Sequence, residues 1–122
     1  MPVDLAQLAE TLRAYGEGYL LTVGDGPRAH AVTVRATLDG AGLRVDGLGR
    51  RTRTNLAKAP EATLLYPPTE RGGYSLIIDG RVEDRDGAAV VVPERAVLHR
   101  PAEPGAAASA TGCASDCVPL EQ

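Results

Sequence analysis

The sequence predicts a mainly β domain, an antiparallel barrel or sandwich of six short strands with only two short helices. Three observations support this fold class. Apolar and polar residues alternate with period two along most of the chain, clusters of Gly, Pro and Asp separate the alternating runs, and only two stretches have helical spacing. A chain of 122 residues is long enough for one hydrophobic core and too short for two.

The first helix is expected directly after Asp4. Asp4 and Gln7 resemble a capping box, in which side chains bond the unpaired amides of the first helical turn. Apolar residues then recur at spacings of three and four, at Leu5, Leu8, Ala9, Leu12 and Tyr15. Gly16 is expected to end this helix, which would cover one end of the core.

Three strands are expected before the second helix. The first covers residues 19–23 and is followed by the turn signal Gly24-Asp25-Gly26-Pro27. The second is long, residues 28–38, with His30 and Val32 on one face and Ala31 and Thr33 on the other. A tight hairpin at residues 39–42 leads into the third strand, residues 43–48.

Three more strands are expected after the second helix. They cover residues 62–66, residues 74–83, and a last strand or broken pair at residues 89–92 and 96–99, on either side of Pro93. A bend is expected in the fifth strand at Asp79-Gly80. Residues 102–122 are rich in Ala, Gly and Pro, so we expect a domain at residues 1–101 and a C-terminal tail beyond it.

Basic charge is concentrated between the third strand and the second helix. Four cations lie between Asp46 and Glu61, in a protein whose net charge is −3: Arg50, Arg51, Arg53 and Lys58. Thr52 and Thr54 are candidate N-cap residues for a helix that ends at Pro60. Arginines beside a helix N-terminus are suited to bind an anion, and we hypothesise that it is a cofactor phosphate. The alternative is a solvated basic turn.

The composition limits the class of partner. Phe and Trp are absent and only four residues are Tyr, so the core is aliphatic and thin, and we expect a homodimer to complete its burial. The acidic balance and the few aromatic residues argue against nucleic acid. No apolar run approaches the roughly 18 residues that span a bilayer, so no membrane partner is expected and the expected location is cytoplasmic.

No metal site or nucleophilic triad is expected. The two cysteines, Cys113 and Cys117, and the two histidines, His30 and His99, would have to come from distant parts of the chain. His30 is interpreted either as a polar contact for a ligand or as a partly buried strand histidine. Tyr66 and Tyr74 are expected in the core or an interface.

The order of these elements resembles the pyridoxamine 5'-phosphate oxidase-like split-barrel family. The resemblance covers residues 5–100, and its most specific parts are Gly26-Pro27, the segment from Asn55-Leu56 to Pro60, and residues 77–83. It implies a six-stranded antiparallel split β-barrel with an N-terminal helix and one short helix after strand three. It also implies a homodimer that holds a coenzyme at its interface. The coenzyme is either flavin mononucleotide or a deazaflavin, and the sequence does not decide between them.

The family pattern also implies which residues touch the cofactor. Carried onto this sequence, the ring system lies along His30, Ala31, Val32 and Thr33, the ribityl side along Val45 and Asp46, and the phosphate on Arg50, Arg51, Thr52 and Arg53, with Ser75 as a further contact. No catalytic residue is implied.

The activity implied is that of an oxidoreductase, which transfers a hydride between the bound cofactor and a small unsaturated acceptor. Alternatives are a flavin- or deazaflavin-binding protein without catalysis and a cofactor-free split-barrel interaction module. His30 stands where the oxidase has Arg, and Arg51-Thr52 where it has an Arg-Lys pair. Because a counterpart of the oxidase's C-terminal substrate-binding segment is also missing, activity on pyridoxal substrates is not expected.

Overall fold

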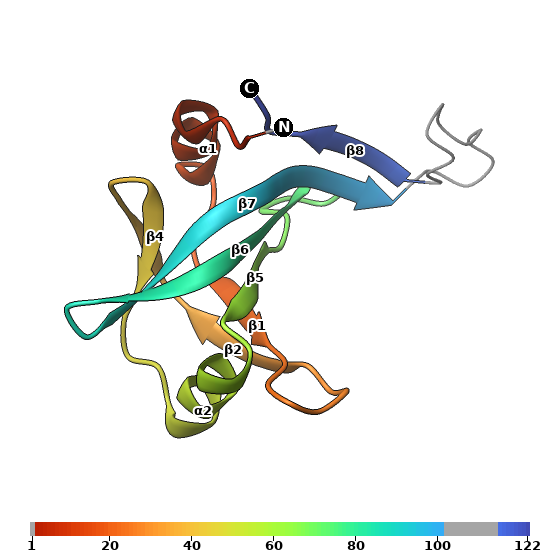
Figure 1. The fold of residues 1–122 in the computed structure, drawn as a ribbon. Coiled ribbons are helices and arrows are strands. Elements are labelled where there is room, and N and C mark those ends of the chain that lie inside the picture. Colours follow the sequence, from red (N-terminus) through yellow and green to blue (C-terminus); the bar gives the residue numbers. More distant parts are fainter. Residues whose placement is uncertain (1, 102–114) are drawn as a thin grey trace.

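A computed structural model describes residues 2–101 and 115–122. Figure 1 shows a strongly curved antiparallel sheet with a helix at each end. The helices and strands, in chain order, are α1 (Leu5–Leu12), β1 (Gly18–Thr22), β2 (His30–Val34), β3 (Ala36–Asp39), β4 (Gly42–Val45), α2 (Arg50–Lys58), β5 (Glu61–Tyr66), β6 (Ser75–Arg85), β7 (Ala88–Pro101) and β8 (Ser115–Pro119).

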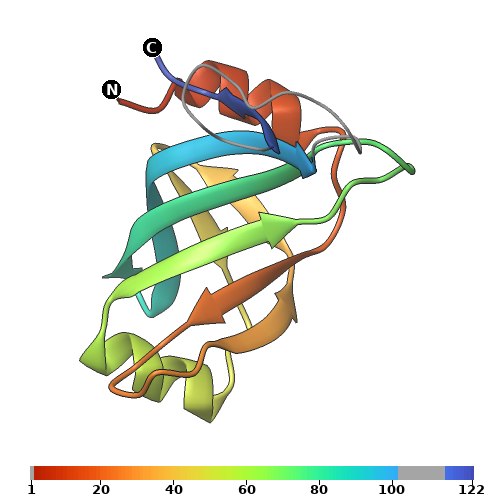
Figure 2. The ribbon, with the colours of Figure 1, turned by 90° about the vertical axis from the view of Figure 1, so that its right-hand side faces the viewer.

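The sheet closes into a split barrel. The strand order is β2-β1-β5-β6-β7-β4-β3, and β8 pairs with β7. The two strands at the ends of this order, β2 and β3, are consecutive in the chain and separated only by Arg35. The sheet therefore curls back on itself, as Figure 2 shows from the side, and the mainly β, split-barrel prediction is confirmed.

The prediction of six strands is corrected to eight in the described part of the chain. The expected second strand, residues 28–38, is two strands, because β2 pairs with β1 whereas β3 pairs with β4, and the chain changes partner at Arg35. The eighth strand, β8, lies within the segment that we expected to be a tail.

The strand expected to be last or broken, β7, is continuous, and its neighbour β6 is bent where expected. β7 runs through Pro93, which lies opposite Gly80, and the register of β6 and β7 shifts between Asp79 and Gly80. A side chain at Gly80 would clash with the carbonyl oxygen of Val92. Only Gly allows the two backbones to approach this closely at the bend.

The last eight residues return to the fold. β8 pairs with β7, the Leu120 amide donates to the Ala96 carbonyl at 2.8 Å, and Val3 bridges Glu121. Leu120 is 1% exposed and packs in the core. Residues 115–122 are thus not the loose tail that we expected, while the remainder of that segment, residues 102–114, lies outside the described residues.

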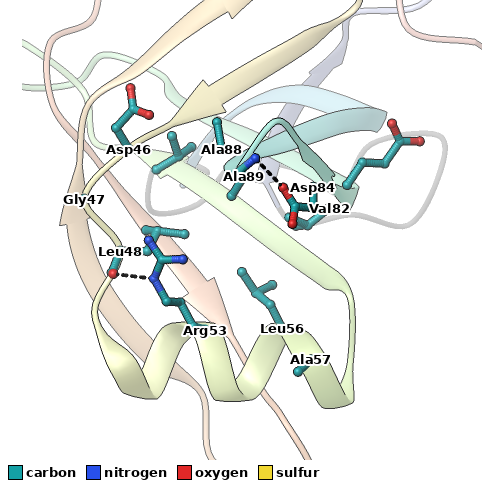
Figure 3. Close-up of a pocket in the computed structure, with 13 residues that line it drawn as sticks. Asp46, Gly47, Leu48, Arg53, Leu56, Ala57, Val82, Asp84, Ala88 and Ala89 are labelled. Atoms are coloured by element: carbon teal, nitrogen blue, oxygen red, sulfur yellow. Dashed lines mark hydrogen bonds between the residues drawn. The ribbon is translucent and has the colours of Figure 1, made fainter.

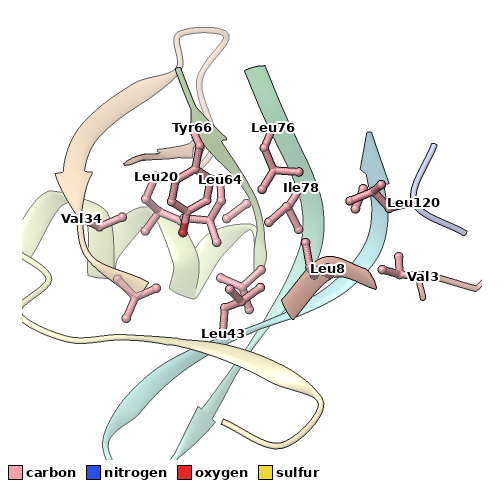
Figure 4. Packing of buried hydrophobic residues seen from close by; sticks show 14 of the residues in the cluster. Val3, Leu8, Leu20, Val34, Leu43, Leu64, Tyr66, Leu76, Ile78 and Leu120 are labelled. Atoms are coloured by element: carbon pink, nitrogen blue, oxygen red, sulfur yellow. The ribbon is translucent and has the colours of Figure 1, made fainter. Parts of the chain in front are cut away.

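The core is aliphatic with one central tyrosine, as the composition predicted. Figure 4 shows Leu20, Leu43, Leu64 and Ile78 around Tyr66 inside the barrel, with Leu8 of α1 closing one end. The Tyr66 ring packs edge-on against Tyr15, with 6.0 Å between centroids. The Asp4 carboxylate accepts from the Gln7 amide at 3.1 Å, which confirms the predicted cap of α1.

Candidate anion-binding site at the α2 end of the barrel

Helix α2 begins earlier than the sequence analysis expected. Its N-cap is Gly49, not Thr52 or Thr54, and Gly49 offers no side chain to the amides of the first turn. The first intrahelical bond runs from the Arg53 amide to the Gly49 carbonyl, at 3.1 Å. The amides that precede Arg53 in the helix therefore lack intrahelical acceptors, and the positive end of the helix dipole is uncapped.

The first turn of α2 borders a cavity of about 340 Å³ that also touches β2, here named the β2 cavity. Its walls come from three segments, β2, the β4–α2 loop and the first turn of α2. The lining residues are His30, Val32, Thr33, Val34, Asp46, Gly47, Leu48, Gly49, Arg50, Arg51 and Thr52. Seven of the predicted site residues therefore meet at one place: His30, Val32, Thr33, Asp46, Arg50, Arg51 and Thr52.

Four predicted site residues lie elsewhere. Ala31 is exposed on the outer face of β2, opposite His30 and Val32, and Val45 is 1% exposed and lines a neighbouring cavity. Arg53 lines a neighbouring cavity, and Ser75 pairs with His99 on the far half of β6.

The sequence analysis missed four lining residues, Val34 and the loop residues Gly47, Leu48 and Gly49. Gly49 carried a usable signal, because Gly is accepted at N-cap positions and would have moved the expected helix start forward.

The β2 cavity holds an unpaired set of hydrogen-bond donors. Arg50 and Arg51 are exposed and make no ion pair with any residue in the described part of the chain. Thr52 is 1% exposed, and its hydroxyl has no hydrogen-bond partner among the described residues. The nearest acidic residue of the lining, Asp46, accepts from Arg44 at 3.2 Å. Buried hydroxyl groups are usually paired, so the Thr52 hydroxyl is a candidate donor to a bound anion.

Side-chain contacts hold α2 against the barrel. The Asn55 amide donates to the Thr22 hydroxyl at 3.1 Å, and a side chain at Gly24 would collide with Asn55. Lys58 pairs with Asp25 at 2.9 Å, and the hydrogen bond from Lys58 lowers the pKa of that carboxyl. Asn55 and Lys58 are therefore occupied in anchoring the helix, which leaves Arg50 and Arg51 available to a ligand.

A second cavity, about 290 Å³, lies on the other side of the β4–α2 loop and is here named the hairpin cavity (Figure 3). It is bounded by the Asp46–Gly47–Leu48 loop, by Arg53, Leu56 and Ala57 of α2, and by the β6–β7 hairpin. The Arg53 Nε donates to the Leu48 carbonyl at 2.9 Å. The three loop residues thus form a shared wall between the two cavities.

The remaining titratable candidates lie outside the two cavities. Tyr66 is in the core, where burial raises the pKa of its hydroxyl. The Tyr74 hydroxyl donates to Asp116 at 2.6 Å, and this bond raises the pKa of Tyr74. In residues 2–101 and 115–122, no cluster of three His, Cys, Asp or Glu side chains could hold a metal ion. No helix of these residues is long and apolar enough to cross a bilayer.

The chain is similar to two mycobacterial proteins in sequence and to a clostridial protein in structure. The chain is 47% identical over 132 residues to the uncharacterized protein Mb0449c of Mycobacterium bovis and, equally, to the uncharacterized protein MT0457 of Mycobacterium tuberculosis; the alignments cover 95% of this chain and 93% of each relative. No family model matches the sequence. A NimC/NimA family protein from Clostridium acetobutylicum is similar in structure, with a TM-score of 0.59 and 14% identity over 98% of this chain and 95% of the other. This likeness supports the split-barrel fold of the chain.

Proposed function

The chain belongs to the same family as the two mycobacterial proteins, and on that premise we propose that it binds flavin mononucleotide or a deazaflavin coenzyme by its phosphate in the β2 cavity. We further propose that it transfers a hydride between the cofactor ring and a small unsaturated acceptor. The cofactor supplies the redox chemistry, and the protein binds and orients it and excludes water.

The observation that carries the phosphate assignment is the hydroxyl of Thr52. It is buried in the first turn of an uncapped helix, beside two arginines that have no ion-pair partner in the described part of the chain. Backbone amides, a hydroxyl and two guanidinium groups around one cavity form a donor set suited to phosphate oxygens. A solvated basic turn would have no reason to bury the Thr52 hydroxyl without an acceptor.

The ring system of the cofactor is proposed to extend from this cavity along β2. His30 and Val32 face the cavity and are half-buried, so they offer one polar contact and one apolar contact. A cavity of about 340 Å³ is at the small end of the range for ligand sites. We therefore expect it to hold the phosphate end and to leave part of the ring for a second subunit to cover.

A homodimer is proposed through the outer face of the sheet next to β2. Tyr19 pairs with Leu65, and Leu65 with Ile77, so three apolar side chains form a row across β1, β5 and β6. Tyr19 is 42% exposed in the single chain. Light scattering should give twice the chain mass for the wild type and a monomer for Tyr19→Lys. A monomeric wild type at micromolar concentration would contradict this assembly.

The binding test is a fluorescence titration of the purified protein with flavin mononucleotide and with a deazaflavin coenzyme. Arg51→Gln should weaken binding by about tenfold or more, because a hydrogen bond to a charged group contributes about 1.5–3 kcal/mol. Arg71→Gln is the matched control, since Arg71 is exposed in the β5–β6 loop. Uptake of neither coenzyme, or equal affinity in the Arg51 variant, would overturn the phosphate assignment.

The activity test uses the loaded protein. The reduced cofactor should be reoxidised by an enone or quinone acceptor, followed by absorbance, faster than the free reduced cofactor is. Tight binding with no acceleration would favour the alternative of a non-catalytic binding protein.

A further inference from the structure

The hairpin cavity is not used by the proposed phosphate site, and its lining combines apolar walls with a single cation. The apolar walls are Val45, Leu48, Leu56, Val82, Ala88 and Ala89, and the cation is Arg53. Figure 3 shows Arg53 rising from α2 toward Leu48, next to Leu56, with Val82 and Ala89 across the cavity. The lining also contains three carboxylates, those of Asp46, Glu83 and Asp84. A pocket with apolar walls and a few convergent charged groups is a typical arrangement for a small ligand.

The guanidinium of Arg53 is held in place and only partly used. Its Nε donates to the Leu48 carbonyl at 2.9 Å, and that is its one hydrogen bond to the described part of the chain. The two terminal nitrogens have no acceptor among the described residues. A guanidinium with a fixed orientation and two unused donor groups matches the two oxygens of a carboxylate.

Each acidic residue around the hairpin cavity already has a partner. Glu83 pairs with Arg81 at 2.9 Å and with Arg85 at 3.0 Å, and the hydrogen bond from Arg81 is the main cause of the lowered pKa of Glu83. Asp84 accepts from the Gly87 amide at 2.9 Å, and Asp46 accepts from Arg44. These carboxylates leave Arg53 unpaired, and their charge disfavours a dianion such as phosphate over a singly charged ligand.

We propose that the hairpin cavity is a second binding site, for a small organic monocarboxylate whose carboxylate pairs with Arg53 and whose apolar body packs on Leu56, Val82 and Ala89. The cavity of about 290 Å³ limits the ligand to a single ring or a short branched chain. The site is independent of the phosphate site, because Arg50 and Arg51 line only the β2 cavity.

The test is an NMR titration of the full-length, ¹⁵N-labelled protein with benzoate and, separately, with neutral benzamide. Benzoate should shift the amide signals of Leu56, Val82 and Ala89, and it should bind roughly tenfold more tightly than benzamide because of the charged pair. Equal affinities for the two probes, or benzoate shifts confined to Thr33, Gly49 and Arg51, would overturn the proposal.

Two variants and one control identify the site. Arg53→Gln should lower benzoate affinity roughly tenfold, and Ala57→Phe should abolish binding by filling the cavity from the exposed side of α2 while leaving Arg53 intact. Arg50→Gln should leave benzoate affinity unchanged. The melting temperature of each variant shows that it is folded. Benzoate affinity that is retained in folded Ala57→Phe, or that falls as much in Arg50→Gln as in Arg53→Gln, would refute the assignment.

Inorganic phosphate separates this proposal from the cofactor proposal. It should shift the signals of Gly49, Arg51 and Thr52 and should not compete with benzoate. Competition between the two anions would place both at one site and overturn the second-site proposal, whereas the flavin titration of Arg51→Gln tests the cofactor proposal separately.

Discussion

At the α1 end of the barrel Leu8 and Leu120 are buried and the helix is capped by a side chain, whereas at the α2 end the chain leaves cations, a helix terminus and a buried hydroxyl without partners among the described residues. The α1 helix has a side-chain cap from Asp4, and α2 has none. Figure 1 shows β8 beside α1 as a further cover at that end. The difference is in line with the proposal that the α2 end binds ligands while the α1 end contributes stability.

The α1 end, here called the closed end in contrast to the open α2 end, also contains a cluster of polar contacts around Asp116. Asp116 of β8 accepts from the Tyr74 hydroxyl at 2.6 Å and from Arg100 at 2.9 Å, and the Arg100 guanidinium stacks 4.6 Å from the centre of the Tyr74 ring. The Tyr15 hydroxyl donates to the Tyr74 carbonyl at 2.7 Å. These contacts connect β8, β7 and the segment after α1. At the α2 end, side-chain contacts of Asn55 and Lys58 hold the helix against the barrel.

The largest expected effect is the loss of folding stability when Leu8 at the closed end is replaced. Leu8 is fully buried, so Leu8→Ala should lower the free energy of unfolding by about 3 kcal/mol through lost burial and the cavity left behind. Urea denaturation measures this change. Arg50→Ala at the open end is the comparison and should stay within about 0.5 kcal/mol of wild type. A loss below about 1 kcal/mol for Leu8→Ala would mean that the α1 end is not a structural cap.

The second effect has opposite signs for stability and for binding. Thr52→Val removes a buried hydroxyl without a partner and keeps the shape of the side chain, so the ligand-free protein should gain up to about 1 kcal/mol. Its affinity for the phosphate-bearing cofactor should fall several-fold.

Tyr66→Phe is the matched control for Thr52→Val. In the described part of the chain, the Tyr66 hydroxyl is the other buried side-chain polar group without a hydrogen-bond partner. It lies inside the barrel (Figure 4). This variant should gain stability with unchanged cofactor affinity. If Thr52→Val destabilises the ligand-free protein while Tyr66→Phe does not, the Thr52 hydroxyl already has an acceptor within the protein. That result would contradict its proposed role as a donor to the cofactor phosphate.

A smaller effect is expected from capping α2. Gly49 has an extended backbone and open space around it, so Gly49→Asp should place a carboxylate on the uncapped amides and raise stability by about 0.5 kcal/mol. The same carboxylate should compete with the cofactor phosphate and weaken its binding. Gly49→Ala adds a side chain without an oxygen and should not stabilise the protein. Stronger cofactor binding in Gly49→Asp would argue against a phosphate at this helix end.

The smallest expected effect is the contribution of Asp116, at the closed end, to the pH dependence of folding stability. The hydrogen bond from Tyr74 holds the pKa of Asp116 below the usual aspartate value of 3.8. A carboxyl whose pKa is lower in the folded state stabilises the fold above its unfolded value, and that contribution is lost as the pH falls through the folded value. Stability should therefore fall below about pH 3.8, and the fall should be shallower in Asp116→Asn. Urea midpoints measured between pH 5 and 3 test this, and identical slopes would contradict it.

The sequence predicted the local features of the fold. The capping residue Asp4 and the bend at Gly80 each depend on the chemistry of one or two neighbouring residues. The split of the second strand was not predictable in this way, because β2 and β3 have the same alternation and differ only in the strand with which each pairs.

The candidate site was predicted only in part for a similar reason. Arg51 and Arg53 were both predicted at the phosphate, as members of one basic loop, although α2 begins at Arg50. Two residues apart on a helix differ in direction by about 200°, and the structure places Arg51 at the β2 cavity and Arg53 at the hairpin cavity. An earlier helix start, inferred from Gly49, would have separated them.

What the sequence determined by itself was the two helices, most of the strand positions and the gathering of cations between β4 and β5, because caps, turns, alternation and charge are properties of adjacent residues. Only the tertiary structure decided which cations share a cavity and that β8 completes the closed end. Strand pairing and helix packing join residues far apart in the chain, such as Leu120 with Ala96 and Asn55 with Thr22, and no local pattern encodes those contacts.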